Sequence, residues 1–361
     1  MTAPTQDPPA SRPPREEALR ATEEITEAAP GILRLQLPIR MPGLGHVNCY
    51  ALEDEKGWTV VDPGMPGPKP WKAMTARFRS VGFDVRHIHT VIVTHSHVDH
   101  FGGSGRLRKE AGATVVASTG FRTWWDPDDV DDPEVWEGVD FDSHAVPWDR
   151  PTPWGGEHPR PPASVRLRYR VLRPVMKRWF PTPRPSLRLA DAATTRLGGR
   201  DWVAVHTPGH TPDHLCLFDP EAGVLLSGDH VLPTITPHIS GVDAGPDPLA
   251  AFVDSLHKVG RLEGVKHVLP AHGHPFTDLH GRIDAIHRHH DERLERLTGF
   301  LADAGEATVV ELSQKLFRPA VWGAMADSET FAHLEHLRLS GAADRREIDP
   351  GPGGMYRYHL T

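Results

Sequence analysis

The segment Thr94–His100, with the sequence THSHVDH, constrains this chain more than any other feature. It follows the apolar run Val-Ile-Val, which is typical of a buried strand. Burying three imidazoles and a carboxylate without partners would cost on the order of several kcal/mol, so these side chains need a common partner. Alternate residues of an extended segment point the same way, which places His95 beside His97. Asp99 and His100 follow after the chain begins to turn, so the motif favours two adjacent metal positions over one.

Three further polar residues stand at the ends of apolar runs. His210 lies in HTPGHTPDH, Asp229 in LLSGDH and His272 in VLPAHG. Each has Gly or Pro close by, as expected where a strand turns into a loop. With the first motif they make five His and two Asp, a donor set that suits two divalent cations with positions left open for water.

Composition limits the classes of protein this chain can be. Its 361 residues are 38% hydrophobic, and the net charge of −8 gives no global field for nucleic acid. Two cysteines cannot build a disulfide scaffold. No apolar run is long enough to cross a bilayer, and the first residues lack the apolar core of a signal peptide. We therefore expect a cytoplasmic protein with no membrane partner.

The chain divides into three predicted parts. Residues 1–30 hold six prolines without an apolar period and predict a disordered tail. Over residues 31–278, short β-like runs alternate with helical segments such as 70–82, 102–112 and 247–262, which predicts layered α/β architecture. Residues 279–361 read as helix, helix, helix and ribbon, the outline of a small winged-helix-like domain.

Residues from about 121 to 189 interrupt the α/β pattern. Nine acids and no basic residue lie between 126 and 142, and nine basic residues and no acid between 160 and 188. Ten prolines fall between Pro147 and Pro185, so we expect an insertion over the sheet and not another layer of it. The insertion is also rich in Trp and Arg.

The metal motif resembles that of the metallo-β-lactamase fold superfamily, whose signature is His-x-His-x-Asp-His followed by separate His, Asp and His residues. The resemblance covers roughly residues 32–278 and implies an αβ/βα sandwich with a dinuclear site. It implies that one metal is held by His95, His97 and His210, and the other by Asp99, His100 and His272. Asp229 would bridge both metals. In such a protein Asp62, in VVDPG, orients the cluster from outside the ligand set.

The expected chemistry is hydrolysis. Two neighbouring metals lower the pKa of a shared water towards about 7 and make a hydroxide available at neutral pH. Zinc is the first expectation, with iron or manganese as alternatives, because the motif does not choose among them. We take Asp99, Asp229 and His230 as candidate catalytic residues. His214, like His230, is a candidate for supporting or contacting the site, and His46 and Asn48 are candidates for lining the pocket.

Two reaction classes remain open for the substrate. The layout of the C-terminal region resembles the β-lactamase-like protein 2 subgroup, in which some members cut single-stranded RNA and related fungal members are thioesterases of carrier proteins. The first hypothesis is an acyl ester or thioester hydrolase, acting on a small molecule or an acyl carrier, with the Trp, Pro and Arg-rich insertion walling an apolar pocket. The alternative is a single-stranded RNA endonuclease, against which the acidic net charge counts. The C-terminal domain could also form a homodimer.

Overall fold

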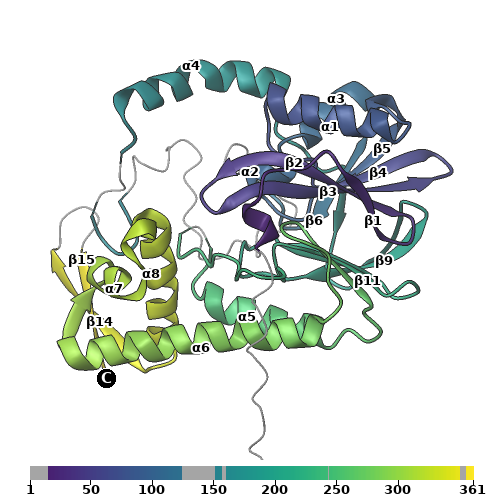
Figure 1. The fold of residues 1–361 in the computed structure, drawn as a ribbon. Helices are drawn as coiled ribbons and strands as arrows, with labels where there is room; N and C mark the ends of the chain where they lie inside the picture. Colours follow the sequence, from purple (N-terminus) through teal and green to yellow (C-terminus); the bar gives the residue numbers. More distant parts are fainter. Residues whose placement is uncertain (1–14, 124–150, 157–159, 243, 350–354) are drawn as a thin grey trace, which may run out of the picture.

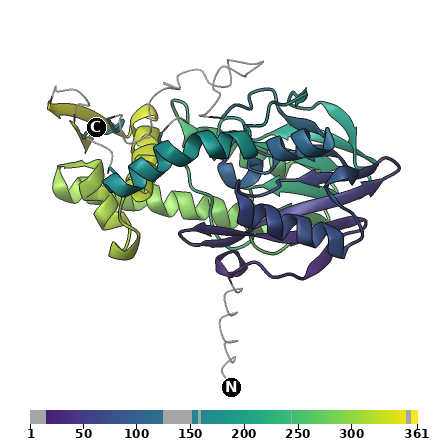
Figure 2. The same ribbon diagram turned by 90° about the horizontal axis from the view of Figure 1, so that it is seen from above.

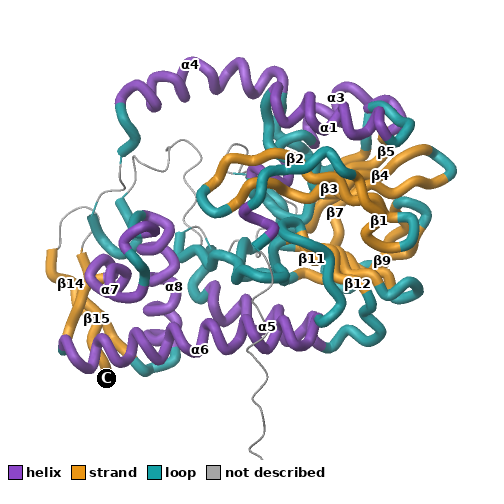
Figure 3. The backbone as a smooth tube through the Cα atoms, viewed as in Figure 1, coloured by secondary structure: helices purple, strands orange, loops and turns teal. Residues whose placement is uncertain are grey.

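The computed structural model describes residues 15–123, 151–156, 160–242, 244–349 and 355–361. Two sheets lie face to face, and helices cover their outer faces (Figures 1 and 3). The predicted αβ/βα sandwich is confirmed by this arrangement.

The first sheet has seven strands in chain order, and the pairing changes from antiparallel to parallel at β4. Strands β1 to β4 pair antiparallel, whereas β4 to β7 pair parallel and are joined by helical crossovers or, before β7, by the insertion. The strands are β1 (Ile25–Ala29), β2 (Ile32–Met41), β3 (Leu44–Asp54), β4 (Gly57–Val61), β5 (Ile88–Ile92), β6 (Thr114–Ser118) and β7 (Leu187–Leu189).

The second sheet has five strands in the order β12-β11-β10-β9-β8. Only the β11 and β12 pair is parallel. The strands are β8 (Thr194–Leu197), β9 (Arg200–His206), β10 (Leu215–Asp219), β11 (Val224–Gly228) and β12 (His267–Pro270).

Alternation along the strands builds three apolar layers. Leu215 and Leu217 of β10 face the first sheet, whereas Cys216 and Phe218 face the outer helices. Because successive side chains of a strand point to opposite faces, one strand can serve two cores. Both faces of these strands are therefore buried, which explains their continuously apolar sequences.

The helices over the first sheet are α1 (Pro68–Ser80), α2 (Val98–Phe101) and α3 (Ser104–Ala111), with a short 3₁₀ turn η2 (Val85–His87) between α1 and β5. Met74 and Phe78 of α1 and Leu107 of α3 fill the apolar layer beneath them. Over the second sheet, α5 (Pro248–Gly260) buries Phe252, Leu256 and related side chains. Asp247 caps α5 by accepting a hydrogen bond from the Ala250 N–H at 3.0 Å.

The insertion differs from the irregular segment that the sequence predicts. Residues Ala163–Trp179 form helix α4, which spans the upper edge of the molecule in Figure 1 and crosses from the sandwich towards the C-terminal helices in Figure 2. Its apolar residues recur at helical spacing among the arginines, a period that the prolines around it obscure. The last residues of the predicted insertion join the sheet as β7. The acidic segment 126–142 lies outside the described residues.

The N-terminal tail is shorter than predicted. Residues 16–18 form a 3₁₀ turn, η1 (Glu16–Ala18), and strand β1 pairs with β2. Glu16 accepts hydrogen bonds from Arg34 at 2.6 Å and from Gln36 at 2.7 Å, which ties the segment to the sheet. The composition of the region hides these long-range pairings. Residues 1–14 lie outside the described residues.

The C-terminal region has the predicted order of helix, helix, helix and ribbon. Its elements are α6 (Leu279–Ala304), β13 (Glu306–Thr308), α7 (Val309–Leu316), η5 (Pro319–Val321), α8 (Ala324–Leu339), β14 (Ala343–Asp349) and β15 (Met355–Leu360). The strands form a small sheet in the order β13-β15-β14. Its assignment as a winged-helix domain, and the domain boundaries, stay predictions.

Helix α6 belongs to two cores. Leu279, Ile283 and Ile286 pack in the layer that holds α5, whereas Leu297 and Leu301 pack in the C-terminal cluster. Figures 1 and 2 show α6 running beneath both parts.

None of the helices in the described ranges is long and apolar enough to span a membrane.

The double role of α6 gives a first prediction. Ile286→Ala removes a fully buried side chain from the layer beneath the second sheet and should lower the free energy of unfolding by about 2–4 kcal/mol. Glu295→Ala, at an exposed position of the same helix, should change it by less than about 0.5 kcal/mol. Urea unfolding followed by circular dichroism measures both. Equal stability of the two variants would contradict the packing described for α6.

Candidate metal centre

The seven candidate ligands converge at one end of the sandwich. Both sheets supply them, and each lies in a loop or helix that follows a strand. Those after β5 and in α2 are His95, His97, Asp99 and His100, and those from the second sheet are His210 after β9, Asp229 after β11 and His272 after β12. The strands that precede the ligands end at the same edge of the sandwich, so the loops that follow them lie side by side. Residues 177 positions apart in sequence therefore meet here.

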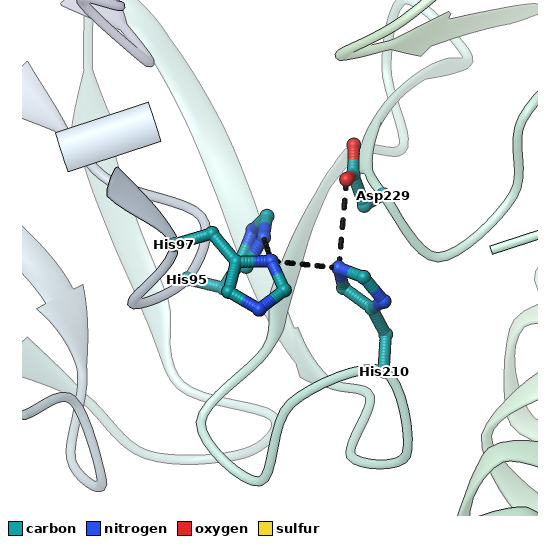
Figure 4. Close-up of side chains that lie close together, drawn as sticks. All are labelled: His95, His97, His210 and Asp229. Carbon is teal, nitrogen blue, oxygen red and sulfur yellow. Dashed lines mark hydrogen bonds and ion pairs between the residues drawn. The ribbon is translucent and has the colours of Figure 1, made fainter. Parts of the chain in front are cut away.

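The first cluster consists of His95, His97, His210 and Asp229, whose ligand atoms all lie within 4.8 Å of one another (Figure 4). His97 Nδ1 is 3.0 Å from His95 Nε2 and 3.0 Å from His210 Nε2. His210 Nε2 is 3.5 Å from Asp229 Oδ2. A tetrahedral zinc with nitrogen ligands at about 2.0–2.1 Å requires about 3.3 Å between those nitrogens, so the spacing fits a metal.

The second cluster consists of Asp99, His100 and His272. Asp99 Oδ2 is 3.5 Å from both His100 Nε2 and His272 Nε2. Asp229 reaches this cluster too, with Oδ1 3.5 Å from His272 Nε2 and Oδ2 3.6 Å from His100 Nε2. The Asp229 carboxylate thus lies between the two clusters, as the sequence resemblance implies.

Buried polar atoms at the centre lack ordinary partners. His100 Nε2, His272 Nε2 and Asp229 Oδ1 are buried and have no hydrogen-bond partner within the described part of the chain. Leaving such atoms unpaired costs about 1–3 kcal/mol each. A cation held among them would satisfy all three, so this donor set fits a metal pair.

The outer ring nitrogen of each of four histidines is fixed by a hydrogen bond. His100 Nδ1 lies 3.0 Å from Asp62 Oδ2, and His95 Nδ1 lies 3.0 Å from Thr94 Oγ1. His210 Nδ1 donates to the His238 carbonyl at 2.7 Å, and His272 Nδ1 donates to the His46 carbonyl at 2.8 Å. These bonds leave Nε2 of each ring facing the centre and orient it as a ligand.

Asp62 ties the motif to the neighbouring strand. Besides His100, it accepts hydrogen bonds from the Thr94 N–H at 2.9 Å and the Thr94 hydroxyl at 2.8 Å. Its φ of 51° lies in the left-handed region, which Asp tolerates better than most residues. This single carboxylate therefore fixes both the start of the motif and the ring of His100.

Two glycines allow the loops that carry His210 and Asp229 to pack closely against their neighbours. A side chain at Gly209 would lie 2.4 Å from the Phe252 backbone of α5, so only Gly places His210 there. A side chain at Gly228, which has a φ of 51°, would lie 2.6 Å from His214 Nε2. Each glycine immediately precedes a candidate ligand.

The two clusters differ in charge. Burial lowers the pKa of His95 well below its usual value and that of His97 to about 3, so both rings are neutral. In the second cluster burial acts in the same direction, but the carboxylates of Asp99 and Asp229 outweigh it and raise the pKa of His100 and His272. Those imidazoles in turn hold the pKa of Asp99 and Asp229 below the usual range despite burial.

His214 and His230 lie behind the ligands. His214 Nδ1 is 2.7 Å from the Thr207 hydroxyl, and its Nε2 accepts a hydrogen bond from the Asp229 N–H at 3.0 Å. It therefore supports the loop that carries Asp229. The His230 ring is buried and packs against Phe252 with ring centroids 5.0 Å apart. It is not among the clustered side chains, and its candidate catalytic role stays a prediction.

His46 and Asn48 are buried links and do not line an open pocket. Asn48 donates to the carbonyls of Pro270 and Gly273, both at 2.8 Å, and so secures the loop that carries His272. The His46 ring bonds the Leu19 carbonyl at 2.9 Å. Their effect on the site is to position the backbone around His272.

Sequence reasoning missed two supporting residues. Asp213 is fully buried, and burial raises its pKa to about 7. It accepts a hydrogen bond from Ser96 Oγ at 2.9 Å, which fixes the residue between two candidate ligands. Its place in the polar run after His210 could have indicated it. His238 acts through its backbone carbonyl, for which side-chain patterns give no signal.

The C-terminal region reaches the centre through His238. The His238 ring lies 3.4 Å from Glu329 Oε2 of α8, and Arg293 of α6 pairs with the same carboxylate. Glu329 is buried, and despite that burial His238 and Arg293 hold its pKa below the usual range. Two helices outside the sandwich thus support a loop that orients His210.

Asp62→Asn tests the orienting hydrogen bonds. The amide keeps the size of the side chain and tolerates the left-handed backbone, but it loses the charge that pairs with His100. We expect metal affinity, measured by competition with a chelator, to fall about 10- to 100-fold. Asp54→Asn removes a similar Asp–His pair, with His89 at 2.9 Å, away from the centre. A loss of affinity in both variants alike would contradict the orienting role.

The charge difference between the clusters predicts ordered metal loading. Because the raised pKa of His100 and His272 keeps them protonated to higher pH, a metal must displace those protons, and its affinity rises with pH through that range. In the first cluster the pKa of His95 and His97 is lowered, so these two rings have no proton to release near neutrality. We expect the protein stripped of metal to bind fewer zinc equivalents at the lower of two pH values than at the higher one, measured by elemental analysis after gel filtration, with the second cluster losing its metal first as the pH falls. Identical stoichiometry at both pH values would contradict this assignment of charge.

Comparison with known proteins assigns the chain to a family. The family model described as the metallo-beta-lactamase superfamily matches residues 42–303. A solved metallo-beta-lactamase family protein from Thermus thermophilus is 28% identical and has a TM-score of 0.70, covering 92% of this chain and 99% of its own. A probable metallo-hydrolase, YqjP, of Bacillus subtilis is 24% identical over 85% of this chain and 93% of its own.

Shorter matches reach fungal proteins. An atrochrysone carboxyl ACP thioesterase of Aspergillus novofumigatus is 30% identical over 37% of this chain and 38% of its own length. For several other curated relatives, too, the chain spans less than two thirds of their length. Because the family model covers well over half of the chain, this protein belongs to the metallo-β-lactamase superfamily and is a hydrolase of that superfamily.

Proposed function

We propose that this hydrolase is a dinuclear enzyme that cleaves an acyl ester or thioester. The observation that carries the dinuclear part is the position of Asp229, whose two carboxylate oxygens face histidines of both clusters at 3.5–3.6 Å. Two cations held by the two clusters would both lie next to this carboxylate, an arrangement that suits a two-metal hydrolase.

The donor set favours zinc. Nitrogen donors from five histidines and oxygen donors from two aspartates suit a borderline-soft divalent ion, and the sites leave coordination positions open. Iron or manganese would fit the same donors and is distinguished by metal analysis. When bound, the metal pair would supply a water activated for attack at neutral pH and polarise the substrate carbonyl.

The chain's own residues prepare that reaction. Asp99 and Asp229 stay ionised because the neighbouring imidazoles lower their pKa, so their oxygens can accept hydrogen bonds from the attacking water and orient it. The hydrogen bonds to Asp62, Thr94, and the carbonyls of His46 and His238 hold the rings in place before substrate arrives. Such preorganisation avoids rearrangement during the reaction.

Two observations favour acyl over phosphodiester substrates. A relative named as an ACP thioesterase aligns with part of this chain. In addition, α8, the third helix of the C-terminal domain and the one that a winged helix uses to read nucleic acid, is largely buried between Ala326 and Leu337. A helix packed into the protein cannot enter a groove. We therefore propose an acyl substrate, on a small molecule or a carrier, in a cytoplasmic enzyme.

An activity panel tests the substrate class. Purified, metal-analysed protein is assayed with acyl-CoA thioesters, lactones, p-nitrophenyl esters and single-stranded RNA. We expect hydrolysis of thioesters or esters, with no cleavage of RNA. Cleavage of RNA alone would overturn the acyl proposal and favour an endonuclease.

Asp229→Ala tests the shared carboxylate. We expect the variant to lose at least one of two zinc equivalents. Its kcat should fall about a hundredfold or more, because two metal ions together would activate the attacking water. Asp254→Ala, at an exposed position of α5, serves as the control and should keep both equivalents. Full metal content and activity in Asp229→Ala would refute the bridging role.

A further inference from the structure

An apolar cavity of about 430 Å³ lies between α4 and α2. Val165, Leu172 and Met176 of α4 line one side, and Val98 and Phe101 of α2 line the other. Its volume falls in the range of small-molecule pockets, about 300–1,000 Å³. The side chains of α4 do not close it, because Val165 and Leu172 remain 49% and 42% exposed.

The cavity and the metal centre share α2 as a wall. In a helix, Val98 and Phe101 lie on one face, and Asp99 and His100 lie on the opposite face. The ligands Asp99 and His100 are accordingly buried towards the centre, whereas Val98 and Phe101 border the cavity. Val98 stands directly between the candidate ligands His97 and Asp99, and His97 is itself partly exposed. One residue of the cavity wall, Val98, is therefore the neighbour in the chain of two candidate ligands.

We propose that this cavity binds the apolar acyl chain of the substrate, and this inference rests on the proposed acyl hydrolase function. With the carbonyl at the metal centre, the chain would pass the N-terminal end of α2 beside Val98 and lie between α2 and α4. The apolar lining gives such a chain its affinity, since each buried methylene strengthens binding by about fourfold. A short acyl group such as acetyl cannot extend past Val98 into the cavity and gains nothing from it.

Among the described residues, no tryptophan lines this cavity, although the sequence predicts a wall rich in Trp, Pro and Arg. Trp124, Trp125, Trp136 and Trp148 lie outside the described residues, Trp154 packs on Phe331 in the C-terminal cluster, and the Trp179 ring is 56% exposed. The α4 side of the cavity is formed by Val165, Leu172 and Met176 together with Arg168 and Tyr169. Helix α4 also carries six basic residues and no acid, which favours a thioester on a phosphate-bearing carrier such as coenzyme A.

Matched substitutions on the two faces of α4 test the proposal. Leu172→Gln makes the lining polar, and Leu167→Gln makes the same change at a position that does not line the cavity and is 64% exposed. The zinc-loaded full-length proteins are assayed with acetyl-, hexanoyl- and octanoyl-CoA. We expect the wild type to prefer octanoyl- over acetyl-CoA by at least tenfold in kcat/KM. Leu172→Gln should reduce that ratio at least fivefold, and Leu167→Gln should leave it unchanged.

A binding measurement separates the cavity from catalysis. Dansyl-labelled undecanoic acid is titrated into the same three proteins and followed by fluorescence. We expect Leu172→Gln to weaken binding at least fivefold and Leu167→Gln to leave it unchanged. If no thioester is hydrolysed but this pattern of binding is found, the proposed function fails while the apolar site stands. If thioesters are hydrolysed with no dependence on chain length, or both variants behave alike, the acyl site is overturned and the proposed function stands.

Discussion

The structure depends on the mutual approach of buried nitrogen and oxygen atoms that cannot satisfy one another. His95, His97 and His210 bring three ring nitrogens close together, with His97 Nδ1 3.0 Å from each of the other two Nε2 atoms. Protonating the buried His95 is opposed by its burial, which lowers its pKa well below the usual value. A cation held among these atoms would resolve this conflict, so the donor set that fits a metal is built by the same contacts that form the fold.

The two sheets stabilise that arrangement, because the candidate ligands are attached to several different strands of the sandwich. Each ligand follows a strand of one of the two packed sheets, and β11, which precedes Asp229, is buried along its whole length. Hydrogen bonds from Asp62, from Thr94 and from the main chain then fix the ring torsions. Glycine at positions 209 and 228 removes the side chain that would otherwise hold these loops apart. Ligand geometry is thus set by the core of the protein and not by flexible loops.

The sequence predicts the layered α/β fold because its strands carry clear apolar runs and its helices clear periods. It also provides the seven candidate ligands, because four lie in one motif after an apolar run and three stand where a strand ends close to Gly or Pro. Their division between two metals comes from the family resemblance. It cannot predict contacts made by the main chain, such as the His238 carbonyl that orients His210. It also misses α4, whose aliphatic residues are spaced among arginines and prolines, and the hairpin of β1 and β2, which the polar, proline-containing composition of residues 1–30 obscures. Packing partners, and not local pattern, decide these elements.

The link from Glu329 through His238 to His210 means that the ligand cage is not the property of the sandwich alone. A carboxylate on α8 and a guanidinium on α6 hold a loop whose carbonyl grips one imidazole. Sequence changes in α6 or α8 can therefore alter the orientation of His210 at the candidate metal centre. If the C-terminal region were exchanged for an unrelated one in evolution, the new region would have to hold the His238 loop in place in another way. This requirement limits which C-terminal regions can be joined to such a sandwich.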